Sequence, residues 1–208
     1  MITEIGHFSL VLALCLAAAQ AFFGLAGPLT NRPAWTAAAR PAAFGQFVFV
    51  AISFALLTHA FLINDFSVAY VANHSNSALP TMYRVAAVWG AHEGSLLLWI
   101  LVQATWTVAV CTLSGNLPRD LAAKVVGVLG LVSIGFMLFT LGTSNPFDRL
   151  YPVPADGRDL NPLLQDPALA IHPPMLYMGY VGFSVAFAFA LAAMIEGRLD
   201  SAWARWTR

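Results

Sequence analysis

His172 is the residue whose sequence surroundings most favour metal chemistry. It ends a polar, proline-rich stretch, DGRDLNPLLQDPALAIH, and precedes Pro173, Pro174 and a long apolar segment. A proline disfavours the α region for the residue before it, so we expect His172 to be extended, just outside a helix whose first turn holds the prolines. Imidazole is the commonest protein ligand for metals and is an axial ligand of haem iron. The alternative is a polar cap at a membrane surface.

A second group of candidates lies in the sequence WGAHEG, where Trp89, His92 and Glu93 precede another apolar segment. A helix dipole favours an acidic residue near its N-terminus, and this is the simplest interpretation of Glu93. Ionisable groups at a membrane boundary are costly and tend to be functional, so the alternative is that the His92–Glu93 pair tunes or shields a ligand. The spacing leaves both interpretations open.

The elements that position these residues are predicted to be membrane-spanning helices. Hydrophobic residues make up 59% of the chain and charged residues only 10%. Crossing a hydrocarbon layer takes about 20 apolar residues as helix, and backbone groups in lipid must be hydrogen-bonded internally. We therefore predict an all-α, polytopic bundle. Its five spans are placed near 6–27, 44–63, 94–113, 122–141 and 174–195, joined on one side by long connections at 64–93 and 142–173.

Charge placement predicts the orientation of the bundle. Seven of the ten Lys and Arg residues fall on one side of the predicted spans: Arg32, Arg40, Arg119, Lys124, Arg198, Arg205 and Arg208. Seven of the ten acidic residues fall on the other: Glu4, Asp65, Glu93, Asp148, Asp156, Asp159 and Asp166. The positive-inside rule then places the N-terminus outside and the C-terminus in the cytoplasm. All five histidines fall at or near the outer face, and the absence of a basic stripe argues against a nucleic-acid partner.

Several long motifs resemble the amino-terminal part of the CcmF family, membrane components of cytochrome c haem lyase among the haem-handling proteins. They are GHFSLVLAL from Gly6, DFSVAYVANHSN from Asp65, WGAHEGSLLLW from Trp89, NPFDRL from Asn145 and DLNPLLQDPALAIHPPMLYMGYVGFSV from Asp159. Together they extend over nearly the whole chain. The resemblance implies a role in cytochrome c biogenesis, in which haem is held at the extracytoplasmic face and attached to the cysteines of apocytochrome c.

The resemblance also implies residue roles and partners. His172 matches the first of two outer histidines that hold the substrate haem, so it is expected to be an axial ligand of that haem b. The expected partners are a haem chaperone, apocytochrome c and other haem lyase subunits, with quinol as a further candidate. The expected location is the bacterial inner (plasma) membrane with a periplasmic active face, or the mitochondrial inner membrane if the chain comes from a plant.

The chain departs from the family pattern in ways that limit this expectation. The family's tryptophan-rich motif, its second outer histidine and the histidines of its second, buried b haem are absent from these 208 residues. We therefore expect a fragment of a longer protein or the product of a split gene, inactive as a haem lyase by itself. The alternatives are a haem-free docking subunit of the maturation complex and the paralogous lyase dedicated to cytochrome c nitrite reductase.

Overall fold

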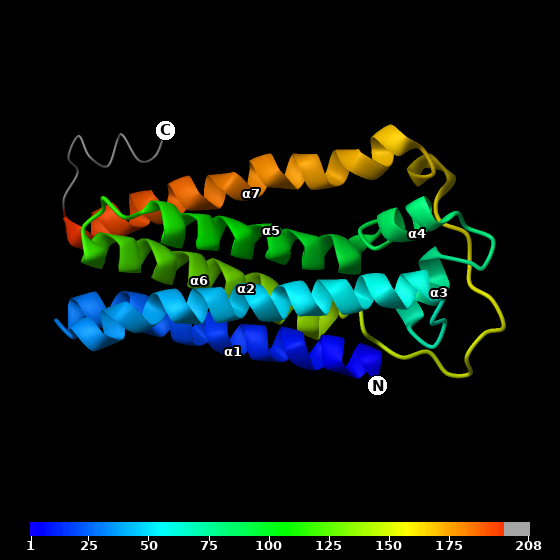
Figure 1. Cartoon of the computed structure of the whole chain (residues 1–208), viewed down its shortest axis with the longest axis horizontal. Helices are drawn as coiled ribbons and strands as arrows, with labels where there is room; N and C mark the ends of the chain where they lie inside the picture. Colours follow the sequence, from blue (N-terminus) through cyan, green and yellow to red (C-terminus); the bar gives the residue numbers. More distant parts are fainter. Residues whose placement is uncertain (198–208) are drawn as a thin grey trace.

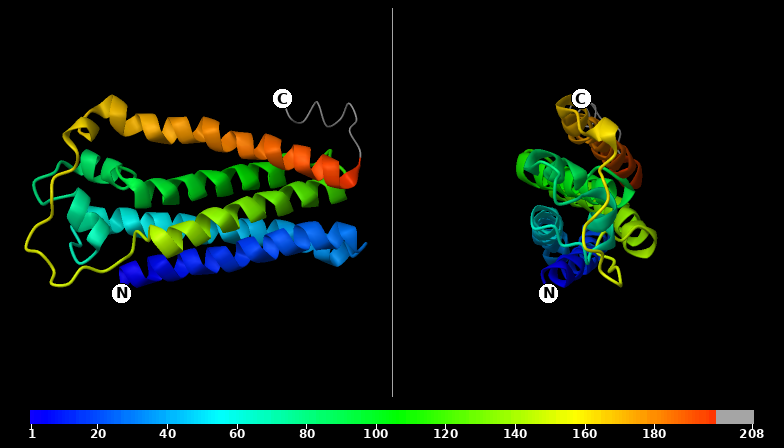
Figure 2. Two further views of the ribbon diagram at one scale, coloured as in Figure 1. Left: turned by 180° about the vertical axis from the view of Figure 1, so that it is seen from behind. Right: turned by 90° about the vertical axis from the view of Figure 1, so that its right-hand side faces the viewer.

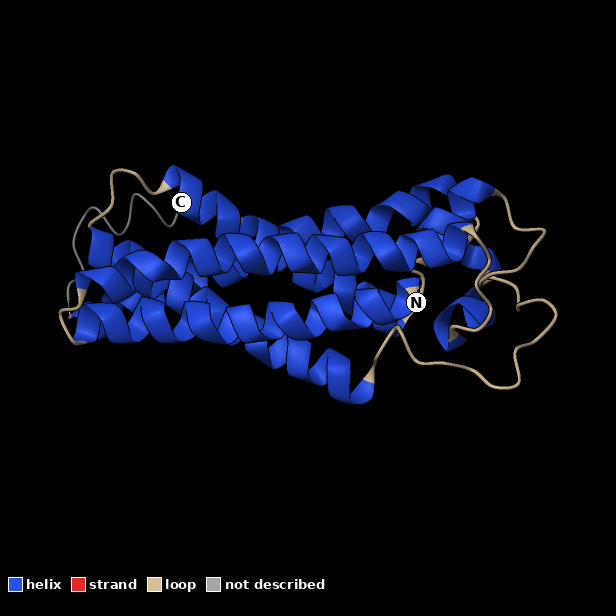
Figure 3. Cartoon of the chain, turned by 60° about the horizontal axis from the view of Figure 1, so that its bottom comes forward, coloured by secondary structure: helices blue, strands red, loops and turns tan. Residues whose placement is uncertain are grey.

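The structure, a computed structural model, describes residues 1–197 as a bundle of long helices capped at one end by short helices and loops (Figure 1). Its five long helices are each long and apolar enough to cross a membrane. They are α1 (Ile2–Leu29), α2 (Pro33–Leu62), α5 (His92–Leu113), α6 (Arg119–Thr143) and α7 (Pro167–Glu196). In the described part of the chain Figure 3 shows helices and loops without strands. The predicted all-α membrane bundle of five spans is confirmed.

Local signals in the sequence set where the helices begin and end. Each long helix begins before its predicted span, because the apolar run marks only the hydrocarbon-crossing part. Pro33 occupies the first turn of α2, where its missing N–H costs nothing. Gly197 ends α7 in the left-handed conformation, with φ of 69°. The tail residues Arg198, Arg205 and Arg208, used above to predict orientation, lie outside the described residues.

Two glycines allow α1 and α6 to pack with their backbones in close contact. A Cβ added to Gly24 would lie 2.6 Å from the carbonyl oxygen of Ala123 and 2.7 Å from the Cα of Gly127. Small residues at helix crossings are typical of membrane bundles, where packing rather than hydrophobicity drives association. Gln20 adds a hydrogen bond of 2.7 Å from its side-chain nitrogen to the carbonyl of Val126 in the same interface.

The cap contains the short helices α3 (Ala69–His74), α4 (Thr81–Ala87) and η1 (Pro162–Leu164). The connection between α6 and α7, yellow in Figure 2, runs across the same end of the bundle as α3 and α4. Its first part pairs with the segment before α3: the Ala69 amide donates to the Asp148 carbonyl at 2.8 Å, and the Leu150 amide donates to the Ser67 carbonyl at 2.9 Å. The two long connections therefore form one structure.

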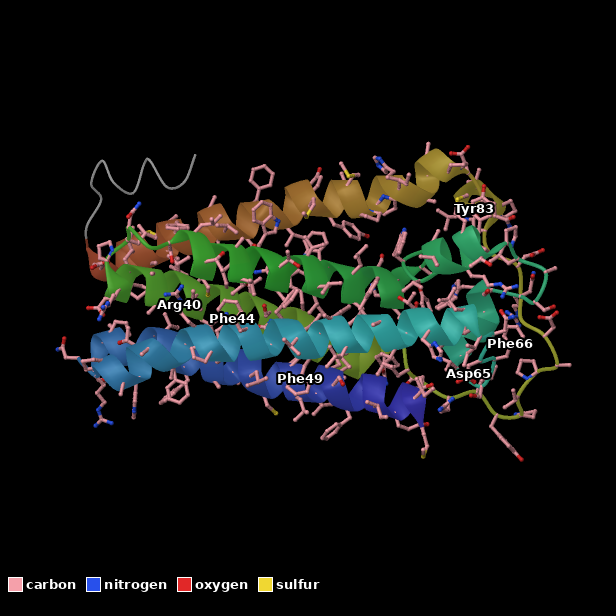
Figure 4. The ribbon with its side chains drawn as sticks, in the orientation of Figure 1. Arg40, Phe44, Phe49, Asp65, Phe66 and Tyr83 are labelled. Carbon is pink, nitrogen blue, oxygen red and sulfur yellow. The ribbon has the colours of Figure 1, made fainter. Side chains whose placement is uncertain are left out.

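Charged groups fasten this cap to the N-terminal helix. The Arg149 guanidinium donates to Glu4 Oε1, with Nε at 3.0 Å, and forms an ion pair of 3.5 Å with Asp65. Figure 4 shows Asp65 and Phe66 at the loop end of the bundle, far from Arg40 near the opposite end. Half-burial works against the charge of Asp65, but hydrogen bonds from Ser67 and the Arg149 charge prevail and lower the pKa of this carboxyl.

A second attachment joins the α6–α7 connection to the loop after α3. Asp156 accepts hydrogen bonds from the Ser77 amide at 2.9 Å and from the Ser77 hydroxyl at 2.6 Å. A Cβ added to the adjacent Gly157 would lie 1.9 Å from the Ser75 carbonyl oxygen, so glycine is required for this approach. The pKa of the Asp156 carboxyl lies below its usual value. The largest cause is the hydrogen bond from the Ser77 hydroxyl, and the hydrogen bonds from the amides of Ser77 and Gly157 add to it.

The α1–α6 contact predicts a sharp difference between two glycine substitutions. Gly24→Ala places a methyl group against backbone atoms that cannot move aside, and such overpacking costs about 1–3 kcal/mol. Gly135→Ala on the exposed side of α6 meets no atom within 4 Å and is tolerated. We expect a lower melting temperature in detergent and lower membrane abundance for Gly24→Ala, and wild-type values of both for Gly135→Ala. Equal losses for both variants would contradict this packing.

The Asp156 attachment is predicted to weaken in acid. A carboxyl whose folded-state pKa is depressed stabilises the fold above its unfolded pKa, and this stabilisation is lost as the pH falls through the folded pKa, here below about pH 4. We expect hydrogen–deuterium exchange at Ser77 and Gly157, corrected for intrinsic rates, to accelerate from pH 5 to pH 3. In Asp156→Asn we expect exchange at these two amides to be fast already at pH 5. An unchanged pH dependence in that variant would assign the effect to another group.

Candidate functional site

His172 lies inside helix α7, and the prediction that it is extended outside the helix is wrong. The helix begins five residues earlier, because Asp166 is its N-cap and Pro167 its first residue. Asp166 Oδ1 accepts hydrogen bonds from the Ala168 amide at 2.8 Å and the Leu169 amide at 3.1 Å. A capping Asp followed by Pro is a strong start signal, whereas the preference imposed on a pre-proline residue is only partial.

The two prolines after His172 each remove one hydrogen bond from the helix. A helical N–H bonds the carbonyl four residues earlier, so Pro173 leaves the carbonyl of Leu169 without its helical donor and Pro174 leaves that of Ala170. Ala170 is only 8% exposed, so water does not replace the donor. The indole Nε1 of Trp89 donates to this carbonyl at 2.9 Å. A side chain 81 residues away therefore supplies the bond that Pro174 removes.

Further contacts hold α7 against α5 along its length. The hydroxyls of Ser95 and Tyr177 are 3.0 Å apart, and the Trp106 indole donates to the Met178 carbonyl at 3.1 Å. Trp99 packs between Phe136 and Tyr177. These tryptophans serve helix packing. The placement of His172 thus depends on the α5–α7 interface.

The His172 ring lies on the surface of the bundle rather than between its helices. Its side chain is exposed, and so are its apolar neighbours Ile171, Met175 and Leu176. Helix α7 is an edge helix, packed against α5 and α6 with its opposite side open (Figure 2). The arrangement is an accessible imidazole on a firmly held helix, surrounded by apolar surface.

The other candidates near α5 face different directions. Trp89 is joined to α7, as described above. His92 Nδ1 is 3.0 Å from the Ser144 hydroxyl, and its ring meets Phe139 edge-on at the end of α6. Glu93 lies in the first turn of α5. The contacts of His92 are with α6, so the structure brings Trp89, but not His92, to the helix that carries His172.

The remaining histidines belong to the same end of the bundle. His7 lies near the start of α1, with Nδ1 3.2 Å from the Asn145 amide nitrogen. His74 ends α3 and bonds the Tyr70 carbonyl at 2.9 Å, and His59 is exposed in the last turn of α2. Within residues 1–197 no group of three His, Cys, Asp or Glu side chains could hold a metal ion together.

Tyr70 is a structural residue that the sequence analysis missed. Its buried hydroxyl accepts from the Ala91 amide at 3.2 Å and lies 3.1 Å from the Val88 carbonyl, so it fixes the corner between α4 and α5. Burial and the nearby Glu93 carboxylate raise the pKa of Tyr70. A Cβ on Gly94 would clash with the Val88 carbonyl in this corner. The only sequence signal is an aromatic residue with a polar group inside an apolar run, which needs a buried partner.

Comparison with known proteins places this geometry in one family. The model of the cytochrome C assembly protein family matches residues 89–208. The chain is 61% identical over its whole length to the cytochrome c-type biogenesis protein CcmF of Pseudomonas aeruginosa, and 54% identical to CcmF of Escherichia coli. It is 44% identical over 94% of its length to the biogenesis protein NrfE of Haemophilus influenzae. The chain spans only 32%, 32% and 31% of these proteins, respectively.

A solved structure agrees with these sequence matches. The cytochrome c haem lyase CcmF superposes on the whole chain with a TM-score of 0.86 at 30% identity, and the chain corresponds to 32% of it. The resemblance inferred from the motifs is confirmed, since the family model, the sequence matches and the solved structure all point to the same family. The chain belongs to the cytochrome C assembly protein family.

Proposed function

We propose that this chain forms the haem-holding part of a cytochrome c haem lyase, in which His172 is an axial ligand of the haem to be attached to apocytochrome c. The observation that carries the proposal is the position of His172: an exposed imidazole on a held edge helix, beside apolar side chains. Membership of a family with a solved relative that is a cytochrome c haem lyase supports the same assignment.

The residues around His172 fit a haem that is cargo. A porphyrin is a flat apolar ring, and Ile171, Met175 and Leu176 offer an apolar surface beside the imidazole. Haem iron has two axial positions, and His172 fills one. The family resemblance assigns the other to an outer histidine and a second, buried b haem to a further pair. Neither set is found among these 208 residues, so both assignments concern the longer proteins of the family.

The chemistry requires little of this chain beyond orientation. In attachment, each of two cysteine thiols adds its S–H across one vinyl C=C of the haem, forming a thioether without a leaving group. An imidazole on the iron fixes the haem plane and tunes its electronic properties. A fixed plane holds both vinyl groups where the cysteines can reach them, and such positioning is a large part of catalysis. His172 therefore orients the reactant and takes no proton.

The membrane setting follows from charge placement. The loop end carries His172 and most of the acidic groups, while Arg32, Arg40 and Arg119 lie at the opposite end. The positive-inside rule puts the loop end outside. The proposal therefore places His172 at the periplasmic face of a bacterial inner membrane, reachable by a haem chaperone and by apocytochrome c. Other lyase subunits, and quinol as reductant, are further proposed partners.

Two other functions remain as alternatives to test. A haem-free docking subunit would use the same bundle without the imidazole. The nitrite-reductase-specific paralogue would differ in the cytochrome it matures, but the identity to NrfE is 44%, below the 61% and 54% to the two CcmF proteins. The identities favour the general lyase.

The proposal predicts that His172→Ala prevents cytochrome maturation without removing the protein. We expect haem-stained c-type cytochrome to fall about tenfold or more at unchanged membrane abundance, because the iron loses a ligand while the exposed side chain supports no packing. His59→Ala is the matched control, an exposed histidine in the last turn of α2. It should leave cytochrome levels unchanged. Normal cytochrome in His172→Ala would favour the docking subunit.

A further inference from the structure

We propose that Trp89 is a positioning residue that keeps the turn carrying His172 helical by replacing the hydrogen bond that Pro174 removes. This inference rests on the proposed function of His172 and adds the device that orients it. The indole Nε1 of Trp89 lies 2.9 Å from the Ala170 carbonyl oxygen, which is the one acceptor that an N–H at position 174 would have used. Pro174 removes the helical donor of the Ala170 carbonyl, and Trp89 replaces it.

The need for this donor follows from the burial of the acceptor. Ala170 is 8% exposed, and a buried carbonyl without a partner is expensive, the more so beside lipid. Without the indole, the segment 169–174 would have to rearrange to find a donor. His172 lies in the middle of that segment, so its ring would lose a fixed direction. The carbonyl left by Pro173 belongs to Leu169, which is exposed and accessible to other donors.

The rigid mounting of Trp89 makes the device effective. Trp89 follows α4, in the corner that the Tyr70 hydroxyl fixes through Val88 and Ala91. Its ring also packs against the cluster of Leu98, Val102 and Val181 between α5 and α7. The donor is therefore held by the cap and the bundle together. A fixed donor sets the position of the carbonyl that it binds.

The chain contains a matched control in Trp106. Its indole also donates to an α7 carbonyl, that of Met178, at 3.1 Å. The residue four positions later is Gly182, which has its own N–H, so the helix satisfies this carbonyl without the indole. Removing the Trp106 donor leaves no unpartnered acceptor. The two tryptophans differ in the one property that the proposal requires.

The test compares Trp89→Phe, Pro174→Ala and the double variant in the intact cellular protein, with Trp106→Phe as control. We measure c-type cytochrome yield per unit of membrane-bound protein and hydrogen–deuterium exchange in residues 169–176. Trp89→Phe should lower the yield about threefold to tenfold and accelerate exchange, since the lost bond is a buried one. Pro174→Ala and Trp106→Phe should match the wild type. The double variant should recover the Pro174→Ala values, because the alanine introduced by that substitution supplies the missing N–H.

Two results would overturn the proposal. One is a double variant as impaired as Trp89→Phe, which would mean that the indole acts otherwise than by completing the helix. The other is an equal loss in Trp106→Phe, which would assign the effect to general packing between α5 and α7. If Trp89→Phe lowers abundance, the exchange data and the recovery in the double variant still decide between these outcomes.

A further combination separates this inference from the proposed function. If Trp89 acts through His172, adding Trp89→Phe to His172→Ala should cause no additional loss of cytochrome, because coupled residues are not additive. Additive losses would contradict a role through His172. If His172→Ala itself matures cytochrome normally, the haem-ligand proposal fails, while exchange in residues 169–176 still reports whether Trp89 completes the helix.

Discussion

The site depends on satisfying backbone hydrogen bonds in a helix that contains two prolines in succession. In a membrane protein an unpartnered buried carbonyl costs several kcal/mol, so each missing N–H must be compensated locally. Here the compensation for Pro174 is the Trp89 indole, and the order of the first turns of α7 then depends on the α4–α5 corner. One hydrogen bond thereby joins two segments that are far apart in sequence but adjacent in the fold.

The same constraint explains why the cap is ordered rather than loose. The Tyr70 hydroxyl fixes the corner between α4 and α5. The connection between α6 and α7 is held at Arg149 and at Asp156, in each case by more than one hydrogen bond or ion pair. These residues touch no candidate ligand. They determine instead where the α4–α5 corner lies relative to α1 and α7. The contacts that fix the helix carrying His172 are therefore distributed over the whole loop end of the bundle.

The sequence predicted five spans correctly because hydrophobic length is a local property with a fixed threshold. The close approach of α1 and α6 at Gly127 follows the general use of small residues at helix contacts in lipid. The start of α7 was not predicted correctly, because two local signals competed. Asp166–Pro167 favours a helix start, and Pro173–Pro174 favours a break. A distant donor, Trp89, makes the second signal tolerable, and no local pattern reveals it. The role of Tyr70 was also not predictable, because its hydrogen-bond partners Val88 and Ala91 are distant in sequence.

Under the proposed function, the exposure of the His172 side chain is a feature that its role requires. A resident haem is enclosed and ligated on both sides, but a haem that must arrive, react and leave needs an open approach. With access alone the imidazole would have no fixed direction, whereas the proposed role requires a fixed haem plane for thioether formation. In this proposal, one side of α7 stays free for the haem, while the other side is held by contacts from Ser95 and Trp89. Access and orientation are thus supplied by opposite sides of the same helix.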